Sequence, residues 1–196
     1  MNKYNIYYLS IDEVNIIIDA AITLKEQVII KILARTGMRR FELCNLRIQD
    51  IDFERKKIYI PVAKRNQVRS VPIDNDTLIT IKAYIAKRKE GRLIQSNHKS
   101  SDGINESRIN KIVKDVAKRA KITNPDPLKK NINPHIFRHS FIRHLLKVGV
   151  PPNYIQQIAG HSDIRSTLQM YGIPSFKDVQ ERYDEILPTM IKKKKP

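Results

Sequence analysis

Residues 51–73, IDFERKKIYIPVAKRNQVRSVPI, differ from the rest of the chain, in which apolar residues recur mainly at helical spacing. Here apolar residues alternate with polar residues or proline, which is the two-residue period of a β-strand, at Ile58, Ile60 and Val62. Arg65-Asn66 is the expected turn, and a second strand is expected from Arg69 to Pro72. Pro61 and Pro72 favour edge positions, because proline cannot donate to a central ladder. The stretch predicts a small antiparallel sheet of two or three strands.

Helices are expected on both sides of this sheet. Ser10 and Glu13 form a capping box that opens the first helix, and the apolar run from Leu24 to Ala34 predicts a buried second helix that ends at Thr36-Gly37. A short helix follows, with its apolar positions at Phe41, Leu43, Cys44 and Leu46. After the sheet, loops at 92–106 and 121–134 separate helical segments at 78–86, 109–120, 141–149, 152–160 and 176–187. The predicted fold is mainly α-helical with one small antiparallel sheet, an α+β class.

The charge of the chain points to a polyanionic partner. Its 196 residues suit one domain. Lys and Arg number 37 against 20 Asp and Glu, which gives a formal net charge of +17 and a pI near 10.0. Nucleic acid is the first candidate partner, and an anionic membrane surface is the second. Binding to phosphates would weaken as salt rises, because it releases counterions.

Composition disfavours several other classes of protein. Cys44 is the only cysteine, so intrachain disulfides and cysteine-based zinc sites are excluded, and we expect a small buried residue in a reducing cytoplasm. The sequence has no pattern typical of a signal peptide and no apolar stretch approaching ~18 residues, so no membrane anchor is expected. It also has no phosphate-binding glycine loop and no acidic metal cluster, so we expect no cofactor and no metal.

Four separated segments contain residue types that often form active sites. They are Thr36-Gly37-Met38-Arg39, the hairpin with Lys64, His135-Ile136-Phe137-Arg138-His139, and Gly160-His161 with Tyr171 ten residues after that histidine. Each alone has an ordinary explanation, such as a surface cation or a buried tyrosine. His135 and His139 also have the i, i+4 spacing of helical metal ligands. However, Ile136 occupies the place of the zinc-protease glutamate, and no Asp or Glu lies between Asp126 and Asp163.

Together, in this order and at these intervals, the four segments resemble the tyrosine recombinase (phage integrase) family over about residues 8–188. The family's first arginine lies in a Thr-Gly-Leu-Arg segment, to which Arg39 corresponds, with Met38 in place of leucine and Glu42-Leu43 continuing the match. The family's hairpin lysine corresponds to Lys64, which lacks the usual neighbouring glycine. The other motifs match in sequence order: His135, Arg138 and His139 in a His-x-x-Arg-His box, then Gly160-His161, then Tyr171.

The resemblance implies the family's catalytic-domain fold and a reaction in which Tyr171 attacks a DNA phosphate, forming a 3′-phosphotyrosyl link and releasing a 5′-hydroxyl without metal or ATP. Two guanidiniums, on Arg39 and Arg138, can hold the non-bridging oxygens with forked hydrogen bonds. The remaining expected roles are general base for His135, support from His139 and Glu42, general acid for Lys64, and hydrogen-bond donor to the phosphate for His161. DNA contacts are expected of the cations Arg40, Arg65 and Arg69.

The implied function is site-specific recombination or integration of double-stranded DNA by a homotetramer, with a dimer on each site and weak association without DNA. The helix at 176–187 would dock on a neighbouring copy or on its own core. A topoisomerase-like relaxing enzyme is one alternative, and a non-catalytic DNA-binding regulator on the same fold is another. Retention of all six candidate catalytic positions disfavours the regulator.

The chain is expected to be a single catalytic domain over residues 1–196, with a core at about 8–188 and a basic tail at 189–196 that includes the lysine run 192–195. Full-length members of the family also have an N-terminal helical domain that closes around DNA. The chain is therefore expected to be either a natural minimal member or a shortened form. Its expected location is the cytoplasm, associated with DNA.

Overall fold

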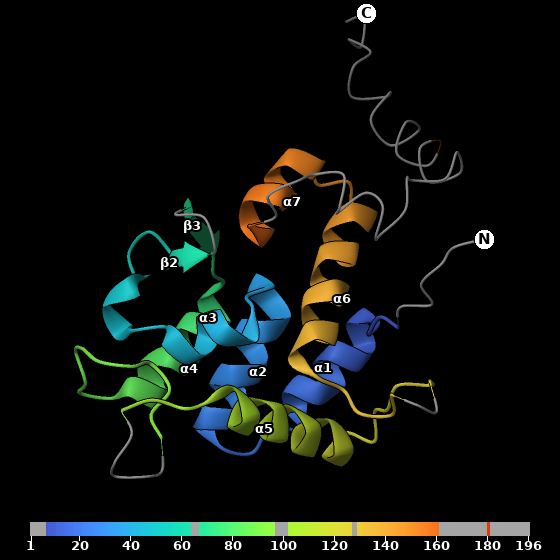
Figure 1. Ribbon diagram of the computed structural model, residues 1–196, viewed down its shortest axis with the longest axis horizontal. Coiled ribbons are helices and arrows are strands. Elements are labelled where there is room, and N and C mark those ends of the chain that lie inside the picture. Colours follow the sequence, from blue (N-terminus) through green and yellow to red (C-terminus); the bar gives the residue numbers. More distant parts are fainter. Residues whose placement is uncertain (1–6, 64–66, 97–101, 127–128, 161–179, 181–196) are drawn as a thin grey trace, which may run out of the picture.

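A computed structural model describes residues 7–63, 67–96, 102–126, 129–160 and 180 (Figure 1). The predicted class is confirmed, since this part of the chain is mainly helical with one small antiparallel sheet. The elements in chain order are α1 (Ile11–Asp19), α2 (Leu24–Thr36), α3 (Arg40–Asn45), the 3-10 turn η1 (Ile48–Asp50), β1 (Ile51–Asp52), β2 (Lys57–Ala63), β3 (Gln67–Pro72), α4 (Asn75–Ile85), α5 (Glu106–Arg119), α6 (Pro134–Lys147) and α7 (Pro152–Ala159).

Helix α2 lies at the centre of the molecule, in contact with α1, α4, α5 and α6 (Figure 1). Five of its apolar side chains are fully buried, at Val28, Ile29, Ile30, Ile32 and Leu33. Each such side chain contributes about 1.5–3 kcal/mol on burial, so α2 contributes substantially to apolar stabilisation. The helix begins with a capping box formed by Thr23 and Glu26, and α1 begins with the expected box of Ser10 and Glu13.

The sheet has the order β1-β2-β3, and all pairs are antiparallel. Pro72 lies on the edge strand β3, as predicted. The edge prediction for Pro61 is wrong, because Pro61 belongs to the central strand β2. Proline is possible there because β1 pairs only with Lys57 and Ile58, and the β2–β3 register shifts between Ile60 and Ala63. The irregular register allows for the missing donor.

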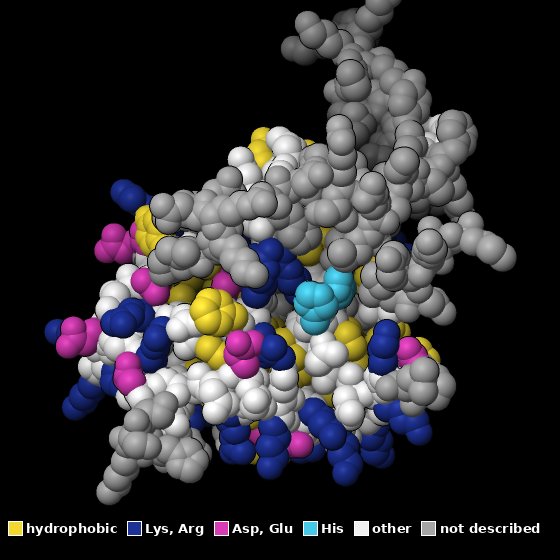
Figure 2. All heavy atoms as spheres, viewed as in Figure 1, with side chains coloured by type: hydrophobic (Ala, Val, Ile, Leu, Met, Phe, Trp, Pro, Cys, Tyr) yellow, Lys and Arg dark blue, Asp and Glu magenta, His cyan; other side chains and the backbone are white. Residues whose placement is uncertain are grey.

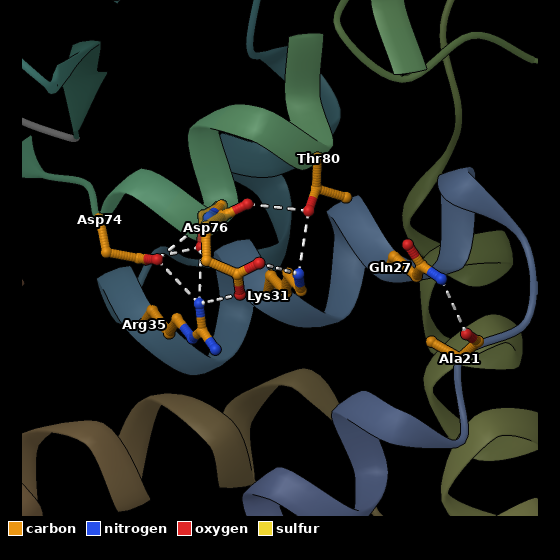
Figure 3. A network of polar contacts seen from close by, with 8 residues as sticks. Ala21, Gln27, Lys31, Arg35, Asp74, Asp76 and Thr80 are labelled. Carbon is orange, nitrogen blue, oxygen red and sulfur yellow. Dashed lines mark hydrogen bonds and ion pairs between the residues drawn. The ribbon is translucent and has the colours of Figure 1, made fainter. Parts of the chain in front are cut away.

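Ion pairs join α4 to α2 directly after β3 (Figure 3). Asp74 caps the N-terminus of α4, and the Arg35 guanidinium donates to Asp74 Oδ1 at 2.8 Å and to Asp76 Oδ2 at 2.7 Å. Lys31 Nζ lies 2.8 Å from the other Asp76 oxygen. Such partly exposed pairs each contribute at most about 1 kcal/mol. Their main effect here is to fix the position of the residues that follow β3 relative to α2.

Several sequence expectations are corrected by the structure. The helix expected at 78–86 begins at Asn75 and ends at Ile85, because Ala86 adopts a non-helical backbone with positive φ (51°) well before Gly91. The segment 92–106 is more than a polar loop, since its apolar residues are buried, at Leu93, Ile94 and Ile104. Phe41 was expected on the apolar side of α3 but is 59% exposed.

The helix expected at 141–149 begins earlier, at Pro134, with Asn133 as its N-cap. The His-x-x-Arg-His segment therefore lies in the first turns of α6 rather than before the helix. Cys44 is buried as expected. No helix in the described part of the chain is long and apolar enough to cross a membrane. The helix expected at 176–187 and the basic tail lie outside the described residues, apart from Gln180.

Candidate active site

A cleft of about 510 Å³ lies where α3, α5 and the start of α6 meet. Its lining includes four of the predicted site residues, Arg39, Arg40, His135 and Arg138. The other lining residues are Met38, Phe41, Glu106, Asn110, Asn133 and Pro134. Figure 2 shows this face of the molecule, on which His side chains lie next to a group of Lys and Arg side chains. The fold thus brings together cations that are about one hundred residues apart in sequence.

Arg39 is the N-cap residue of α3, and its side chain reaches towards α7. Its Nη2 donates to the carbonyl oxygen of Gly160 at 3.0 Å, and its Nη1 donates to Glu42 Oε1 at 3.0 Å. The side chain retains 36% exposure. Arg39 is therefore held at two points while part of its side chain still faces solvent.

Arg138 projects from α6 and is 4% exposed. Its Nη1 donates to the carbonyl oxygen of Gly37 at 2.6 Å, and its Nη2 donates to that of Ala159 at 2.7 Å. Gly37 has a left-handed backbone (φ 62°), and a Cβ there would lie 2.5 Å from Phe141 Cδ1, so the turn that presents this carbonyl needs glycine. Arg39 and Arg138 thus contact adjacent peptide groups at the end of α7.

Glu42 lies between Arg39 and Arg69 and has a side-chain exposure of only 4%. Arg69 Nη1 and Nη2 donate to its two carboxylate oxygens, each at 2.7 Å. The Arg39 backbone N–H also donates to Glu42 Oε2, at 2.7 Å. Burial by itself raises the pKa of Glu42, but the hydrogen bonds and charges of Arg69 and Arg39 hold that pKa below its ordinary value. Glu42 is therefore ionised at neutral pH and bridges Arg39 and Arg69.

Arg69, for which DNA contact is expected, is buried in this structure. Its side chain is 7% exposed, and its guanidinium is occupied by Glu42 and by the carbonyl oxygen of Ile158, which accepts from Nε at 2.9 Å. A buried cation with this set of partners cannot reach a DNA phosphate without breaking an ion pair. Arg40, in contrast, lines the cleft and is partly exposed, with Nε paired to Glu106 Oε2 at 2.5 Å.

His135 and His139 lie one turn apart on α6, with ring centroids 4.3 Å apart in an edge-to-face arrangement. His135 is exposed and lines the cleft, whereas His139 is 8% exposed. Partial burial and the charges of Arg138, Arg39 and Arg40 lower the pKa of His135. Burial, His135 and Arg138 lower the pKa of His139 to about 4. Both rings are therefore neutral at pH 7, and a neutral ring can accept a proton.

Two kinds of position in the site were not predicted from sequence. The carbonyl groups of Ile158, Ala159 and Gly160 each accept from an arginine, but backbone acceptors leave no trace in residue type. Asn133, which caps α6 and lines the cleft, did have a signal, since Asn followed by Pro is typical of a helix start. Lys64, Arg65, His161 and Tyr171 lie outside the described residues.

Comparison with known proteins assigns the family. Residues 8–177 match the phage integrase family, and the chain belongs to it. It is 30% identical over 180 residues to tyrosine recombinase XerA of Pyrococcus horikoshii, covering 90% of this chain and 60% of that protein. It is 34% identical over 150 residues to XerA of Thermococcus onnurineus, covering 75% of this chain and 50% of that protein. The chain thus spans between half and two thirds of the length of these relatives.

Solved structures have the same fold. The crystal structure of a XerA recombinase superposes with a TM-score of 0.75 at 29% identity, covering 91% of this chain and 63% of that one. The integrase of transposon Tn1549, solved in complex with circular intermediate DNA, gives a TM-score of 0.76 at 21% identity, covering 94% of this chain and 68% of that one. The latter likeness is one of fold alone.

Proposed function

We propose that the chain cleaves and rejoins double-stranded DNA as a site-specific recombinase, through a covalent link to Tyr171. One observation supports this most directly. Arg39 and Arg138, from segments far apart in sequence, donate to the adjacent carbonyls of Gly160 and Ala159 beside a cleft that contains His135. Two guanidiniums anchored on adjacent carbonyls and lining one cleft could hold the same phosphate between them.

The chemistry requires positive donors at the phosphate. Attack on a phosphodiester increases negative charge on the non-bridging oxygens, and preorganised donors stabilise that charge without reorganising. Arg39 and Arg138 supply forked, permanently charged donors. Because both side chains are already anchored by backbone carbonyls, little conformational entropy would be lost when the phosphate binds.

In the proposed reaction, the Tyr171 hydroxyl oxygen attacks phosphorus and forms a phosphotyrosyl bond while the bond from phosphorus to the 5′-oxygen breaks. His135 accepts the phenolic proton, for which its lowered pKa leaves the ring neutral at pH 7. Lys64 donates a proton to the leaving 5′-oxygen, and His161 donates a hydrogen bond to the phosphate. Religation reverses these steps with a new 5′-hydroxyl, so neither ATP nor metal is consumed.

DNA is the proposed substrate and partner. The net charge of +17 suits a polyanion, and relatives of the same fold were solved with DNA, among them XerH bound to its difH substrate. We propose assembly as a dimer on each site and a tetramer of two sites, with the segment after Gly160 docking on a neighbouring copy. The protein would then reside on cellular DNA.

The test is covalent capture of DNA. The chain is incubated with a pool of nicked duplexes that have a randomised core, from which the short cleaved fragment diffuses away and traps the intermediate. Wild type should give an adduct on a denaturing gel, and Tyr171→Phe should give none. No adduct from wild type would contradict the enzymatic proposal, and an adduct with Tyr171→Phe would contradict the nucleophile. A plasmid with two copies of the captured site then separates recombination from relaxation alone.

A further inference from the structure

We propose that Arg69 is a positioning residue, whose single buried guanidinium fixes both the direction of Arg39 and the place of the C-terminal end of α7. The inference rests on the proposed function in one respect, since it treats Arg39 as the group that holds the phosphate. Arg69 lies on β3, the strand that follows the Lys64 turn in sequence. One side chain thereby links three parts of the candidate site.

The link to Arg39 passes through Glu42. Oε1 of Glu42 accepts from Arg69 at 2.7 Å and from Arg39 Nη1 at 3.0 Å. Oε2 accepts from Arg69 at 2.7 Å and from the Arg39 backbone at 2.7 Å. The four hydrogen bonds use the whole acceptor capacity of the carboxylate. Without Arg69, Glu42 would have only Arg39 to neutralise it, and the Arg39 guanidinium would be drawn away from Gly160 onto the carboxylate.

The link to α7 is by hydrogen bond and by close packing. Arg69 Nε donates to the Ile158 carbonyl at 2.9 Å. At Gly160 a Cβ would lie 2.8 Å from Arg69 Nη1 and 2.9 Å from its Cδ, so the backbone passes directly over the guanidinium. Gly160 has a left-handed backbone (φ 62°) and immediately precedes His161 in sequence. The C-terminal end of α7, which His161 follows in sequence, is therefore fixed against Arg69.

Two other roles for Arg69 fit less well. Contact with a phosphate would require Arg69 to leave the buried Glu42 carboxylate, to which both of its Nη atoms donate. A role in stability alone would not require an arginine at this position, because a buried ion pair often contributes no more stability than an apolar pair of equal volume. A stabilising pair also would not explain why the same guanidinium contacts both the partner of Arg39 and the carbonyl two residues before Gly160.

Arg69→Lys tests the inference, because lysine keeps the charge but cannot donate the fork. Arg119→Lys is the matched control. Arg119 likewise donates from Nη2 to a glutamate, Glu26, at 2.7 Å and from Nε to a carbonyl, that of Ala20, at 3.2 Å, but it joins α5 to the α1–α2 region. If Arg69→Lys fails to fold, the double variant Glu42→Gln with Arg69→Met is used in its place. This double variant removes both charges and keeps similar side-chain volumes.

The first measurement does not depend on enzymatic activity. Nitrogen-15 NMR follows hydrogen exchange at the Arg39 side chain and at the Gly160 amide, which donates to Gln156 at 2.8 Å. Arg69→Lys should accelerate both by about tenfold or more, as expected of lost local protection, and Arg119→Lys should change neither. Unchanged exchange at Arg39 and Gly160 in Arg69→Lys would overturn the inference, whether or not the chain cleaves DNA.

The second measurement uses the duplex captured by the wild-type chain, with either a normal phosphate or a neutral methylphosphonate at the cleaved position. On the phosphate, Arg69→Lys should slow adduct formation by about tenfold to a hundredfold while DNA affinity stays within about twofold. On the methylphosphonate, Arg69→Lys should slow adduct formation by less than about threefold, because the transition state carries less negative charge for Arg39 to stabilise. An equal loss on both substrates, or a loss matched by Arg119→Lys, would mean that Arg69 is only structural. Failure of wild type to form any adduct would count against the proposed function, and the exchange measurement would still decide the role of Arg69.

Discussion

The buried His139 should make the stability of the protein depend on pH in a way that can be calculated. Its folded pKa is lowered to about 4 from the ordinary 6.5 by burial and by its neighbours His135 and Arg138. Because the folded value lies below the unfolded value, the stability linked to neutral His139 is fully present above about pH 6.5 and is lost as the pH falls towards about 4. A pH of about 5 lies roughly 1.5 units below the unfolded pKa of His139. At that pH the free energy of unfolding should therefore have fallen by about 2 kcal/mol.

The effect is measured by urea unfolding, followed by far-ultraviolet circular dichroism, for wild type and His139→Gln at about pH 7.5 and about pH 5. The free energy of unfolding of wild type should fall by about 2 kcal/mol more than that of the variant. Carboxylates with lowered pKa values, such as Glu42, Asp74 and Asp76, stay largely ionised at about pH 5 and cancel in the comparison. An equal fall in both proteins would refute the proposed burial of a neutral His139.

Three further predictions test particular residues. Arg138→Lys should slow adduct formation by about a hundredfold or more while weakening DNA binding only slightly, as filter binding and adduct gels would show, because lysine cannot bridge a phosphate and two carbonyls. Leu43→Ala should cost about 2–5 kcal/mol in urea unfolding, whereas Phe41→Ala should change stability by at most about 0.5 kcal/mol, since Leu43 is fully buried and Phe41 is 59% exposed. Arg40→Ala should lower the slope of log affinity for duplex DNA against log salt by about one, and an unchanged slope would mean that Arg40 serves only Glu106.

Local sequence rules predicted the elements well where neighbouring residues determine them. Ser10 and Glu13 make the expected capping box, because both partners lie within one turn. The alternation at Ile58 and Ile60 gave strand β2, whose two isoleucines are buried. The failures came where tertiary contacts decide the outcome. Phe41 has the hydrophobicity of a core residue, but it lies on the cleft side of α3, and only packing of the whole molecule determines that direction.

The candidate site was predicted in part. Arg39, His135 and Arg138 do meet, and resemblance to a family identified them where spacing alone could not. The burial of Arg69 against Glu42 could not be predicted, because an arginine beside a hairpin in a basic chain has the same composition whether it faces DNA or a buried carboxylate. The distinction depends on Glu42, a residue 27 positions earlier in sequence whose approach to β3 no local pattern encodes.

The C-terminal end of α7 explains why these arginines occur where they do. A helix ends with carbonyl groups that have no partner within the helix, and its dipole is negative there. Arg69, Arg138 and Arg39 donate to the consecutive carbonyls of Ile158, Ala159 and Gly160, so the helix end provides a fixed negative surface that holds the three guanidiniums together without neutralising them. Carboxylates in place of these carbonyls would neutralise the cations and compete with a phosphate for them. Glu42 is the exception, a carboxylate that contacts two of these arginines. It accepts mainly from Arg69, so the Arg39 side chain donates to it from Nη1 alone and stays partly exposed. The pairing of one buried arginine with one buried carboxylate thus leaves the positive charge of the other two available in the cleft.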